Sequence, residues 1–481
     1  MTAEAPTQPP FASSEIEKRL GQRVSTSLDK SAEGRLWTSD EIAAATGGEA
    51  VGPFVATGVT FDSREVEGGE LFVALKGAAM DGHRFVPQAL ADGAAGVLAS
   101  ATVDGPHVRV ADTTTALDAL ARAARARVGA KVIGVTGSAG KTGTKEALWA
   151  ALDRTRPGRA HRSVKSYNNH TGVPLSLSRM PRDAGFGVFE MGMNHAGELS
   201  ALTRLVRPHV AVVTTVASAH REFFRSEEEI ADAKGEIFQG LEPDGVAFIP
   251  HDNMHRERLR AAAEPHAARV LTFGRGEGAD MRAREAMRSA KGTLVTAKLP
   301  DAELTFTLAP PGEHWVSNAM AVLGAVWAVG GDLTAAGLAL AEMEGLAGRG
   351  ARVVVPAGDG TAVLIDESYN ANPASMAATL ASLGTETGRR LAVLGAMREL
   401  GAEGPRFHRE LVGPLRAAGA RAILVGPEYE ELAGLVDGVR VDDVEGAIVA
   451  LRDELKPGDR VLVRGSNSVG LARLVRAMKG G

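Results

Sequence analysis

The chain has 481 residues, 44% of them hydrophobic, which is enough to fill the cores of about three domains. It carries 54 basic and 59 acidic residues, and a net charge of -5 without a basic block argues against a general nucleic-acid binder. The absence of cysteine excludes disulfides, thiolate catalysis and cysteine-ligated zinc. No apolar run is long enough to span a bilayer and no secretory signal opens the chain, so we expect a cytoplasmic protein without membrane insertion.

The N-terminal quarter divides into an extension and a small domain. Residues 1–34 are rich in proline, alanine, serine and charge, which predicts a disordered extension. Over residues 35–128, a capped helix with a glycine stop, alternating strands and a helix–strand pair predict a small α/β domain. Ser63 and Arg64 interrupt its apolar strands, where they could bind a phosphate or a pyrimidine edge, although an ordinary charged turn has the same composition.

The most informative segment is KVIGVTGSAGKTGTKE, from Lys131 to Glu146. A β-branched run leads into a glycine turn and then into helix-forming residues, which is the order of a phosphate-binding loop. Lys141 would reach the outer phosphates of a nucleotide, and the Thr142 hydroxyl would bind magnesium. Only two residues separate Gly137 from Gly140, so the loop is a shortened variant, and a plain glycine turn is the alternative. We expect ATP or GTP binding.

Strands and helices alternate from residue 130 onward, which predicts a central domain over residues 129–346 with a mainly parallel sheet. Glu190 emerges at the end of an apolar strand, as a magnesium ligand facing the phosphate loop would. His220 and Lys234 follow the next strand, but either residue alone is more typical of surface decoration.

Two polar segments of the central domain are further candidates. The loop SYNNHTG contains Asn169, His170 and Thr171 and could hold a sugar or a diphosphate, although asparagine-rich loops often satisfy their own backbone. His314 and Asn318 are four residues apart near the start of an apolar helix, so they share one face and could meet a nucleotide base.

Residues 347–481 alternate again and predict a Rossmann-like C-terminal domain with its own sheet. Its first strands lead into the polar segment DESYNANP, which begins with Asp366. The fold class is therefore α/β with three domains: a small N-terminal α/β domain, a central P-loop ATPase domain and a C-terminal Rossmann-like domain.

The chain resembles the Mur ligase family, because several of its motifs occur in the order in which that family has them. These motifs are DSR with ALKG, TGSAGKT, YNNHTGVPL, EMGMNHAGE, AKGEIF, GEHWVSN, the arginine of AGR, DESYNANPASM and a final RGS. The resemblance covers the chain from about Leu36 to its end. Four positions depart from the pattern that is common in the family: Ala139, Gly143, Trp315 and Ala396.

The resemblance implies roles for individual residues. Those implied to bind ATP are Gly137, Ser138, Ala139, Gly140, Lys141, Thr142, Gly143, His314, Asn318, Arg349 and Asp366. Those implied to hold magnesium, two ions in the family, are Thr142, Glu190, His220 and a carbamylated Lys234. Those implied to bind the UDP-sugar are Ser63, Arg64, Asn169, His170 and Thr171. Those implied to act in catalysis are Lys141, Lys234, His220 and Arg349.

The resemblance also implies a reaction. It predicts an ATP-dependent ligase of peptidoglycan precursor synthesis that joins D-alanyl-D-alanine to UDP-N-acetylmuramoyl-tripeptide (UDP-MurNAc-tripeptide) through an acyl phosphate. The C-terminal domain would bind the incoming amino component, and we expect a monomer. A sister ligase that adds a different amino acid is the nearest alternative, although the Asp-Asn-Pro-Arg motif typical of diaminopimelate addition is missing from the comparable region. Folate polyglutamate synthesis would leave the first domain without a purpose, and a nucleotide-dependent switch or silent binding protein would have no need of Lys234 and His220.

Overall fold

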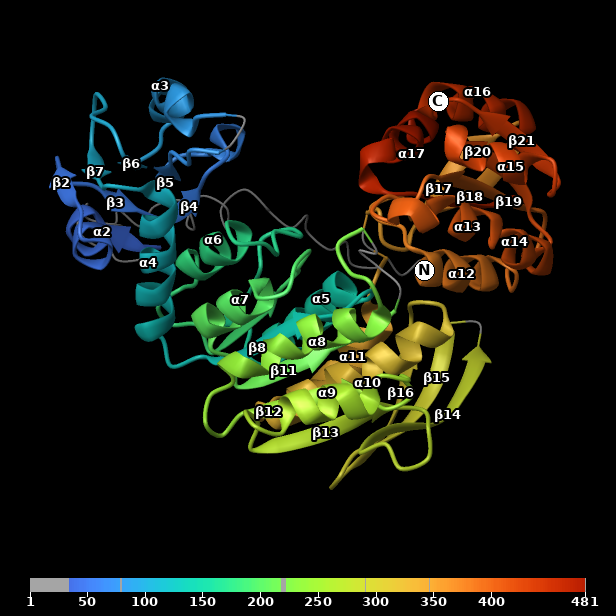
Figure 1. The fold of residues 1–481 in the computed structure, drawn as a ribbon, viewed down its shortest axis with the longest axis horizontal. Coiled ribbons are helices and arrows are strands. Elements are labelled where there is room, and N and C mark those ends of the chain that lie inside the picture. The colour runs from blue at the N-terminus through green and yellow to red at the C-terminus, as the bar shows by residue number, and fades with distance from the viewer. Residues whose placement is uncertain (1–33, 78–79, 218–221, 290, 346, 481) are drawn as a thin grey trace, which may run out of the picture. The chain divides into compact units, whose positions relative to one another are not determined.

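The computed structural model describes residues 34–77, 80–217, 222–289, 291–345 and 347–480. The chain divides into two compact units, Met1–Thr113 and Thr114–Gly481, which are described separately (Figure 1). His220 and nearly all of the expected N-terminal extension lie outside the described residues.

The first unit contains a small, mostly parallel sheet with the strand order β2-β7-β6-β5-β4, in which only β2 runs antiparallel to its neighbour. Thr38 caps the first helix in a reciprocal capping box with Glu41, and Gly47 ends it in the left-handed conformation, as the sequence predicts. The elements are β1 (Trp37–Thr38), α2 (Ser39–Thr46), β2 (Glu49–Val51), β3 (Val55–Ala56), β4 (Gly58–Thr60), β5 (Glu70–Val73), α3 (Val86–Ala91), β6 (Gly96–Ala99) and β7 (His107–Arg109).

The second unit begins with a large sheet in the order β16-β15-β14-β13-β12-β11-β8-β10-β9. Pairing is parallel from β9 to β14 and antiparallel from β14 to β16. The strands are β8 (Lys131–Thr136), β9 (Ala160–Arg162), β10 (Phe186–Glu190), β11 (Val210–Val213), β12 (Val246–Pro250), β13 (Arg269–Gly274), β14 (Met281–Ser289), β15 (Gly292–Lys298) and β16 (Glu303–Leu308).

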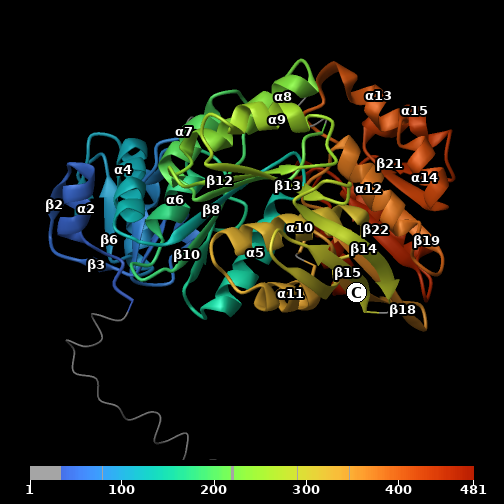
Figure 2. The same ribbon diagram turned by 90° about the horizontal axis from the view of Figure 1, so that it is seen from below.

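Helices cover both faces of this sheet, which explains why its parallel strands are continuous apolar runs rather than alternating ones. Figure 2 shows α5, α10 and α11 on one side and α7, α8 and α9 on the other. The helices are α4 (Thr113–Ala126), α5 (Lys141–Thr155), α6 (Gly172–Ser178), α7 (Glu198–Val206), α8 (Glu227–Gly235), α9 (Arg256–Ala263), α10 (Glu313–Ala328) and α11 (Leu333–Glu342).

The last part of the second unit has its own sheet, in the order β17-β18-β22-β19-β20-β21, parallel apart from β17. Helices α12 to α15 pack on one face and α16 and α17 on the other, so the α/β class is confirmed. The elements are β17 (Ala351–Ala357), β18 (Gly360–Glu367), α12 (Pro373–Leu383), β19 (Arg390–Gly395), α13 (Gly404–Arg409), α14 (Val412–Ala418), β20 (Arg421–Val425), α15 (Glu430–Ala433), β21 (Gly438–Val441), α16 (Val444–Glu454), β22 (Arg460–Arg464) and α17 (Ala472–Lys479).

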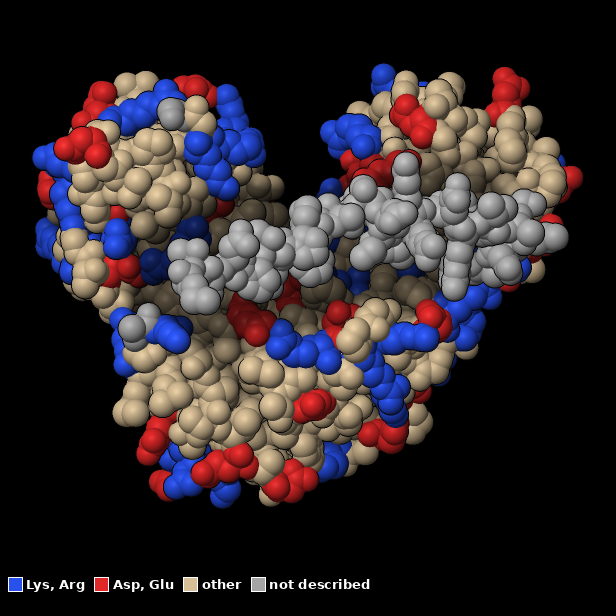
Figure 3. All heavy atoms as spheres, turned by 180° about the vertical axis from the view of Figure 1, so that it is seen from behind, with Lys and Arg blue, Asp and Glu red and all other residues tan. Residues whose placement is uncertain are grey.

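The surface mixes both signs of charge. On the face shown in Figure 3, basic and acidic side chains are interspersed. Within the described part of the chain, none of the helices is both long and apolar enough to cross a bilayer.

Candidate functional site

The loop between β8 and α5 has the strand–turn–helix geometry that the sequence predicts. Gly137 and Gly140 both have positive φ angles, of 150° and 83°. A β-carbon on Gly137 would lie 1.9 Å from the Thr214 hydroxyl oxygen, and one on Gly140 would lie 2.8 Å from the Asn318 amide nitrogen. Only glycine therefore fits at these positions, and the backbone amides can converge at the start of α5, as anion binding requires.

Lys141 opens α5 and folds back over this loop. Its ammonium donates to the carbonyl oxygen of Gly137 at 2.6 Å. Burial lowers the pKa of Lys141, the charge of Glu190 opposes this shift, and the charge of Arg349 reinforces it. The three charged groups thus act on one another within one site.

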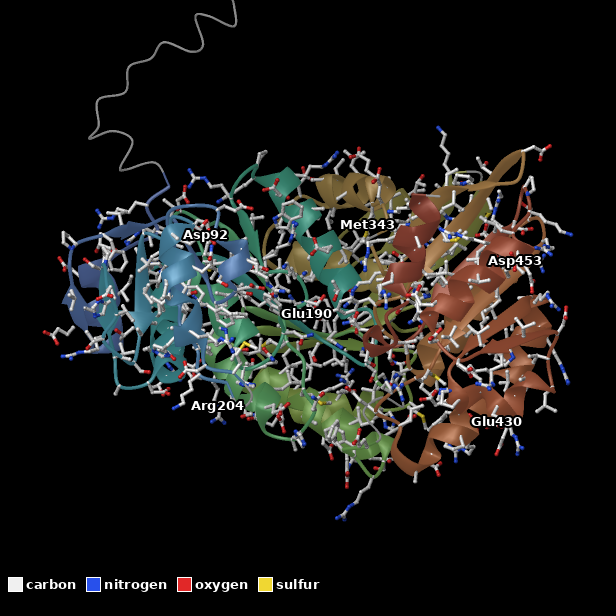
Figure 4. All side chains as sticks on the ribbon, turned by 90° about the horizontal axis from the view of Figure 1, so that it is seen from above. Asp92, Glu190, Arg204, Met343, Glu430 and Asp453 are labelled. Atoms are coloured by element: carbon white, nitrogen blue, oxygen red, sulfur yellow. The ribbon has the colours of Figure 1, made fainter. Side chains whose placement is uncertain are left out.

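The Glu190 carboxylate is the acidic centre of the site. It is buried at the end of β10, where Figure 4 shows it among the inner side chains of its unit. Thr142 donates its hydroxyl to one carboxylate oxygen at 2.7 Å, and the Asn168 amide donates to the other at 2.8 Å. A hydroxyl and a carboxylate beside a phosphate loop are hard oxygen ligands of the kind that magnesium takes together with substrate phosphates.

Lys234 lies on α8 with only 1% of its surface exposed. Burial lowers its pKa well below the usual value, and the positive charge of Lys141 acts in the same direction. Burial of this kind disfavours the ammonium form of the side chain relative to the neutral amine. Lys234 shares a cavity of about 970 Å³ with the phosphate loop and Glu190.

The start of α10 forms another wall of this cavity. Asn318 is buried against Gly140, as described above, whereas His314 lines the cavity and stays exposed. Desolvation in the cavity and the charge of Arg464 lower the pKa of His314 to about 4, so its imidazole is neutral near pH 7.

Trp315 lies against the phosphate loop helix. A β-carbon on Gly143 would lie 2.7 Å from the indole ring of Trp315. The two positions at which the chain departs from the common family pattern here, Gly143 and Trp315, are therefore one packing pair. The Trp315 ring fits at this place because Gly143 has no side chain.

Arg349 lies just before β17, and Asp366 lies near the end of β18. The Arg349 guanidinium donates to the Ser166 hydroxyl at 3.1 Å and lies 4.1 Å from the ring centre of Tyr369. Asp366 is buried and accepts from the backbone amide of Gly348 at 2.8 Å. Asp366 thus fixes the turn that carries Arg349, while the neighbouring Glu367 lines the cavity.

The predicted sugar-binding residues lie elsewhere. Asn169 accepts from the backbone amides of Thr171 and Gly172 at the start of α6, which is the self-satisfying arrangement that the sequence left open. Asn169, His170 and Thr171 are not among the residues that line the cavity described here. In the first unit, Arg64 is 86% exposed at its side chain and forms an ion pair with Asp62.

Two residues at the site were missed by sequence reasoning. Asn168 belongs to the polar loop SYNNHTG but is not one of its three predicted binding residues, although its amide is the one that reaches Glu190. Asn372 caps α12 with its side-chain oxygen and donates its amide to the carbonyl of Ser138 in the phosphate loop at 3.2 Å. An asparagine before a proline predicts a helix cap, but the second bond depends on the tertiary fold.

The cavity therefore brings together the phosphate loop, Glu190, Lys234, His314, Asn318 and Arg349. Cations and backbone amides can neutralise a polyphosphate here, and Glu190 with Thr142 can hold a metal beside it. The arrangement could therefore hold a phosphate group together with a divalent cation.

Comparison with known proteins adds family relationships. Profiles described as the Mur ligase family catalytic domain, the Mur ligase middle domain and the Mur ligase glutamate ligase domain match residues 55–136, 135–326 and 348–467. The chain is 34% identical to the UDP-N-acetylmuramoyl-tripeptide–D-alanyl-D-alanine ligase of Escherichia coli (strain K12), over 88% of this chain and 93% of the relative.

Solved structures agree with this result. A crystal structure of MurF from Acinetobacter baumannii matches with a TM-score of 0.81 and 29% identity, over 92% of this chain and 99% of that one. The MurF ligase from Thermotoga maritima in complex with ADP matches with a TM-score of 0.72 and 28% identity, over 88% of this chain and 97% of that one. The chain therefore has the three-domain Mur ligase fold.

Proposed function

The chain belongs to the Mur ligase family, and we propose that it is the ATP-dependent ligase that joins D-alanyl-D-alanine to UDP-MurNAc-tripeptide in peptidoglycan precursor synthesis. The observation that carries this proposal is the near-full-length match to ligases of that name, together with a phosphate loop that opens into the same cavity as Glu190, Lys234 and Arg349.

The proposed ATP site uses the loop from Gly137 to Gly143. Its backbone amides and Lys141 would bind the phosphates, and His314 and Asn318 would meet the base or ribose. A neutral His314 suits this role because a neutral imidazole can both donate and accept hydrogen bonds. Arg349 would approach the outer phosphates, on the turn that Asp366 fixes.

Magnesium fits the oxygen ligands at Thr142 and Glu190. A bound ion would neutralise phosphate charge as a Lewis acid. Among the described residues no group of three or more histidine, cysteine or acidic side chains is placed to hold a metal, which agrees with a site completed by substrate phosphates. We propose His220 and Lys234 as ligands of a second ion.

Lys234 fits carbamylation. Capture of carbon dioxide requires a neutral amine, and the buried environment of Lys234 favours that form. The amine nitrogen would bond to the carbon of carbon dioxide and lose a proton, which turns the neutral amine into a carbamate anion. Such an anion would be stabilised by the adjacent Lys141, whose charge already acts on Lys234.

The proposed reaction has two steps. The terminal carboxylate of the tripeptide attacks the γ-phosphorus, the bond to the β-phosphate oxygen breaks, and ADP leaves. The amine of the dipeptide then attacks the carbonyl carbon of the acyl phosphate, loses a proton and releases inorganic phosphate. Lys141 and Arg349 would stabilise the charge on the transferred group, because two anions must meet in the first step.

The remaining parts of the proposal concern the other substrate and the organisation of the protein. We propose that residues 35–128 bind the UDP-sugar through Ser63 and Arg64, with Asn169, His170 and Thr171 at its sugar or diphosphate. Residues 129–346 would bind ATP, and residues 347–481 would bind the incoming amino component. We also propose a cytoplasmic monomer that closes around its substrates, which would exclude water from the acyl phosphate.

A phosphate-release assay tests the proposed function. Purified protein with ATP, magnesium, UDP-MurNAc-tripeptide and D-alanyl-D-alanine should release phosphate only when both substrates are present. Single amino acids in place of the dipeptide test the sister-ligase alternative. Release with a single amino acid but not with the dipeptide would contradict the proposal.

A further inference from the structure

A buried lysine of α5 has no role in the chemistry described so far. Lys145 lies one turn after Lys141, and its side chain is completely buried. The ammonium is 2.6 Å from the carbonyl oxygen of Lys165, 3.4 Å from that of Ser163 and 2.8 Å from a carboxylate oxygen of Glu146. An ammonium has three donors, so each donor of Lys145 has an acceptor, as a buried cation requires.

The carboxylate of Glu146 does not depend on Lys145 alone. Its second oxygen is 3.1 Å from the Nε atom of Arg162, and the guanidinium of Arg162 lies 3.4 Å from the ring centre of Trp149. Glu146 therefore keeps a cationic partner when Lys145 is replaced. The contacts that Lys145 supplies without a substitute are those to the two carbonyl oxygens.

Both carbonyls belong to residues 163–168, the segment that follows β9, which we call the β9 loop. Lys165 in this loop has a φ angle of 48°, a left-handed conformation that is unfavourable for residues other than glycine. A hydrogen bond from a charged donor is roughly twice as strong as one between neutral groups. The bond from the Lys145 ammonium to the Lys165 carbonyl thus stabilises the β9 loop at its least favourable residue.

The two ends of the β9 loop hold Glu190. The hydroxyl of Ser163 accepts from the backbone amide of Glu190 at 3.0 Å, and the side-chain amide of Asn168 donates to the Glu190 carboxylate at 2.8 Å. The backbone amide of Gly192 also donates to the carbonyl of Asn168, at 2.7 Å. The position of the Glu190 carboxylate therefore depends on the path of the β9 loop.

The middle of the β9 loop holds Arg349. Ser166 directly follows Lys165, and its hydroxyl accepts from the Arg349 guanidinium at 3.1 Å. The helix that carries Lys145 also begins with Lys141 and Thr142 of the phosphate loop. Lys145 thus connects this helix to the loop that contacts both Glu190 and Arg349.

We propose that Lys145 is a positioning residue for the transfer of the phosphoryl group. By holding the β9 loop, it sets the Glu190 carboxylate and the Arg349 guanidinium at fixed places relative to the phosphate loop. Lys145 is not among the residues that line the cavity, so it acts through these groups. This inference rests on the proposed function and adds a residue to its machinery.

Steady-state kinetics of Lys145→Met test the proposal. Methionine has a similar length but no charge and no donor, so the β9 loop loses its support. A displacement of about 1 Å at such groups can cost about 100-fold in rate, and we expect kcat to fall about 10- to 100-fold. The KM values for UDP-MurNAc-tripeptide and D-alanyl-D-alanine should stay within about twofold of the wild type. Lys145→Gln keeps a neutral donor and should lie between the two proteins.

Arg125 of α4 provides a matched control. It is a buried cation whose guanidinium donates to the carbonyls of Val206 and Arg207, both at 2.8 Å, and pairs with Glu242 at 3.2 Å. Arg125→Met should therefore lower the melting temperature as Lys145→Met does, but it should leave kcat within about twofold of the wild type. An equal fall of kcat in both variants would overturn the proposal, because general destabilisation would then explain it.

Binding of Mn²⁺ provides a readout that needs no turnover. Electron paramagnetic resonance can measure the Kd for Mn²⁺ at saturating concentrations of the non-hydrolysable ATP analogue AMP-PNP. Loss of a residue that orients a metal ligand typically weakens metal binding by 10- to 100-fold, so the Kd should rise about tenfold or more in Lys145→Met. It should not change in Arg125→Met. An unchanged Kd in a folded Lys145→Met protein would overturn the proposal.

The remaining outcomes are also distinguishable. If the wild type releases no phosphate with the dipeptide, the proposed function fails, whereas the Mn²⁺ measurement still tests how Lys145 acts on Glu190. If the wild type and Lys145→Met turn over equally well, only the role of Lys145 is wrong. If neither Lys145→Met nor Lys145→Gln folds, Lys145 serves the stability of the chain and the proposal is overturned.

Discussion

The pairing of Gly143 with Trp315 gives a quantitative prediction. In Gly143→Thr, the new β-carbon would lie 2.7 Å from the indole ring, whereas carbon atoms pack at about 3.5–4.0 Å. The ring packs against the core of the central sheet, so it can retreat only by losing contacts there. Overpacking of this kind costs about 1–3 kcal/mol, and the better helix propensity of threonine returns about 0.5 kcal/mol. We expect a net loss of about 0.5–2.5 kcal/mol in the free energy of unfolding and a higher KM for ATP.

A double-mutant cycle with Trp315→Asn separates the clash from other effects. Without the ring, threonine at position 143 meets no obstacle, so the double variant should be more stable than the sum of the single changes by about 1 kcal/mol or more. Urea denaturation gives the four free energies, and Gly143→Ala serves as a graded control because it also adds the β-carbon. Additivity within about 0.5 kcal/mol would refute the packing argument.

Three further predictions address other parts of the site. Lys234→Ala should abolish phosphate release, and short carboxylic acids added to the assay should restore part of it if a lysine-borne carboxylate is the missing group; full activity without additives would contradict its role. Asn372→Asp should keep the cap of α12 but set a carboxylate oxygen against the Ser138 carbonyl, which should lower the melting temperature and raise the KM for ATP by roughly 5- to 100-fold. Asn372→Ala should lose the cap as well as the donor to Ser138. Burial lowers the pKa of His161 from 6.5 to about 4, so as the pH falls the unfolded chain takes up a proton on this ring before the folded protein does. The free energy of unfolding should therefore be highest above pH 6.5 and fall by up to about 3 kcal/mol as the pH drops to 4. His161→Gln should flatten that slope in urea denaturation curves.

Local patterns were sufficient to predict the α/β class and the position of the main motifs. The run from Lys131 to Glu146 forms a strand, a glycine turn and a helix, and Glu190 lies at the end of its strand. These features depend on hydrophobic periodicity and on glycine, both of which act over short distances.

Features that depend on distant parts of the chain could not be predicted in this way. The packing of Trp315 on Gly143 and the bond from Asn372 to Ser138 join residues that are far apart in sequence. The low pKa of Lys234 depends on burial and on Lys141, which no local pattern reports. Sequence reasoning therefore predicted the types of residue at the site better than their partners.

The hydrogen bonds around His408 have a consequence for the loop that follows β19. Its ring accepts from the amide of Met397 on one side and interacts with the carbonyl of Gly404 on the other, so the main chain at the tip of β19 is held without help from the side chains that follow. Arg398 and Glu399 can then be exchanged while this frame persists. Substitutions at these two positions should therefore leave the main chain at the end of β19 in place.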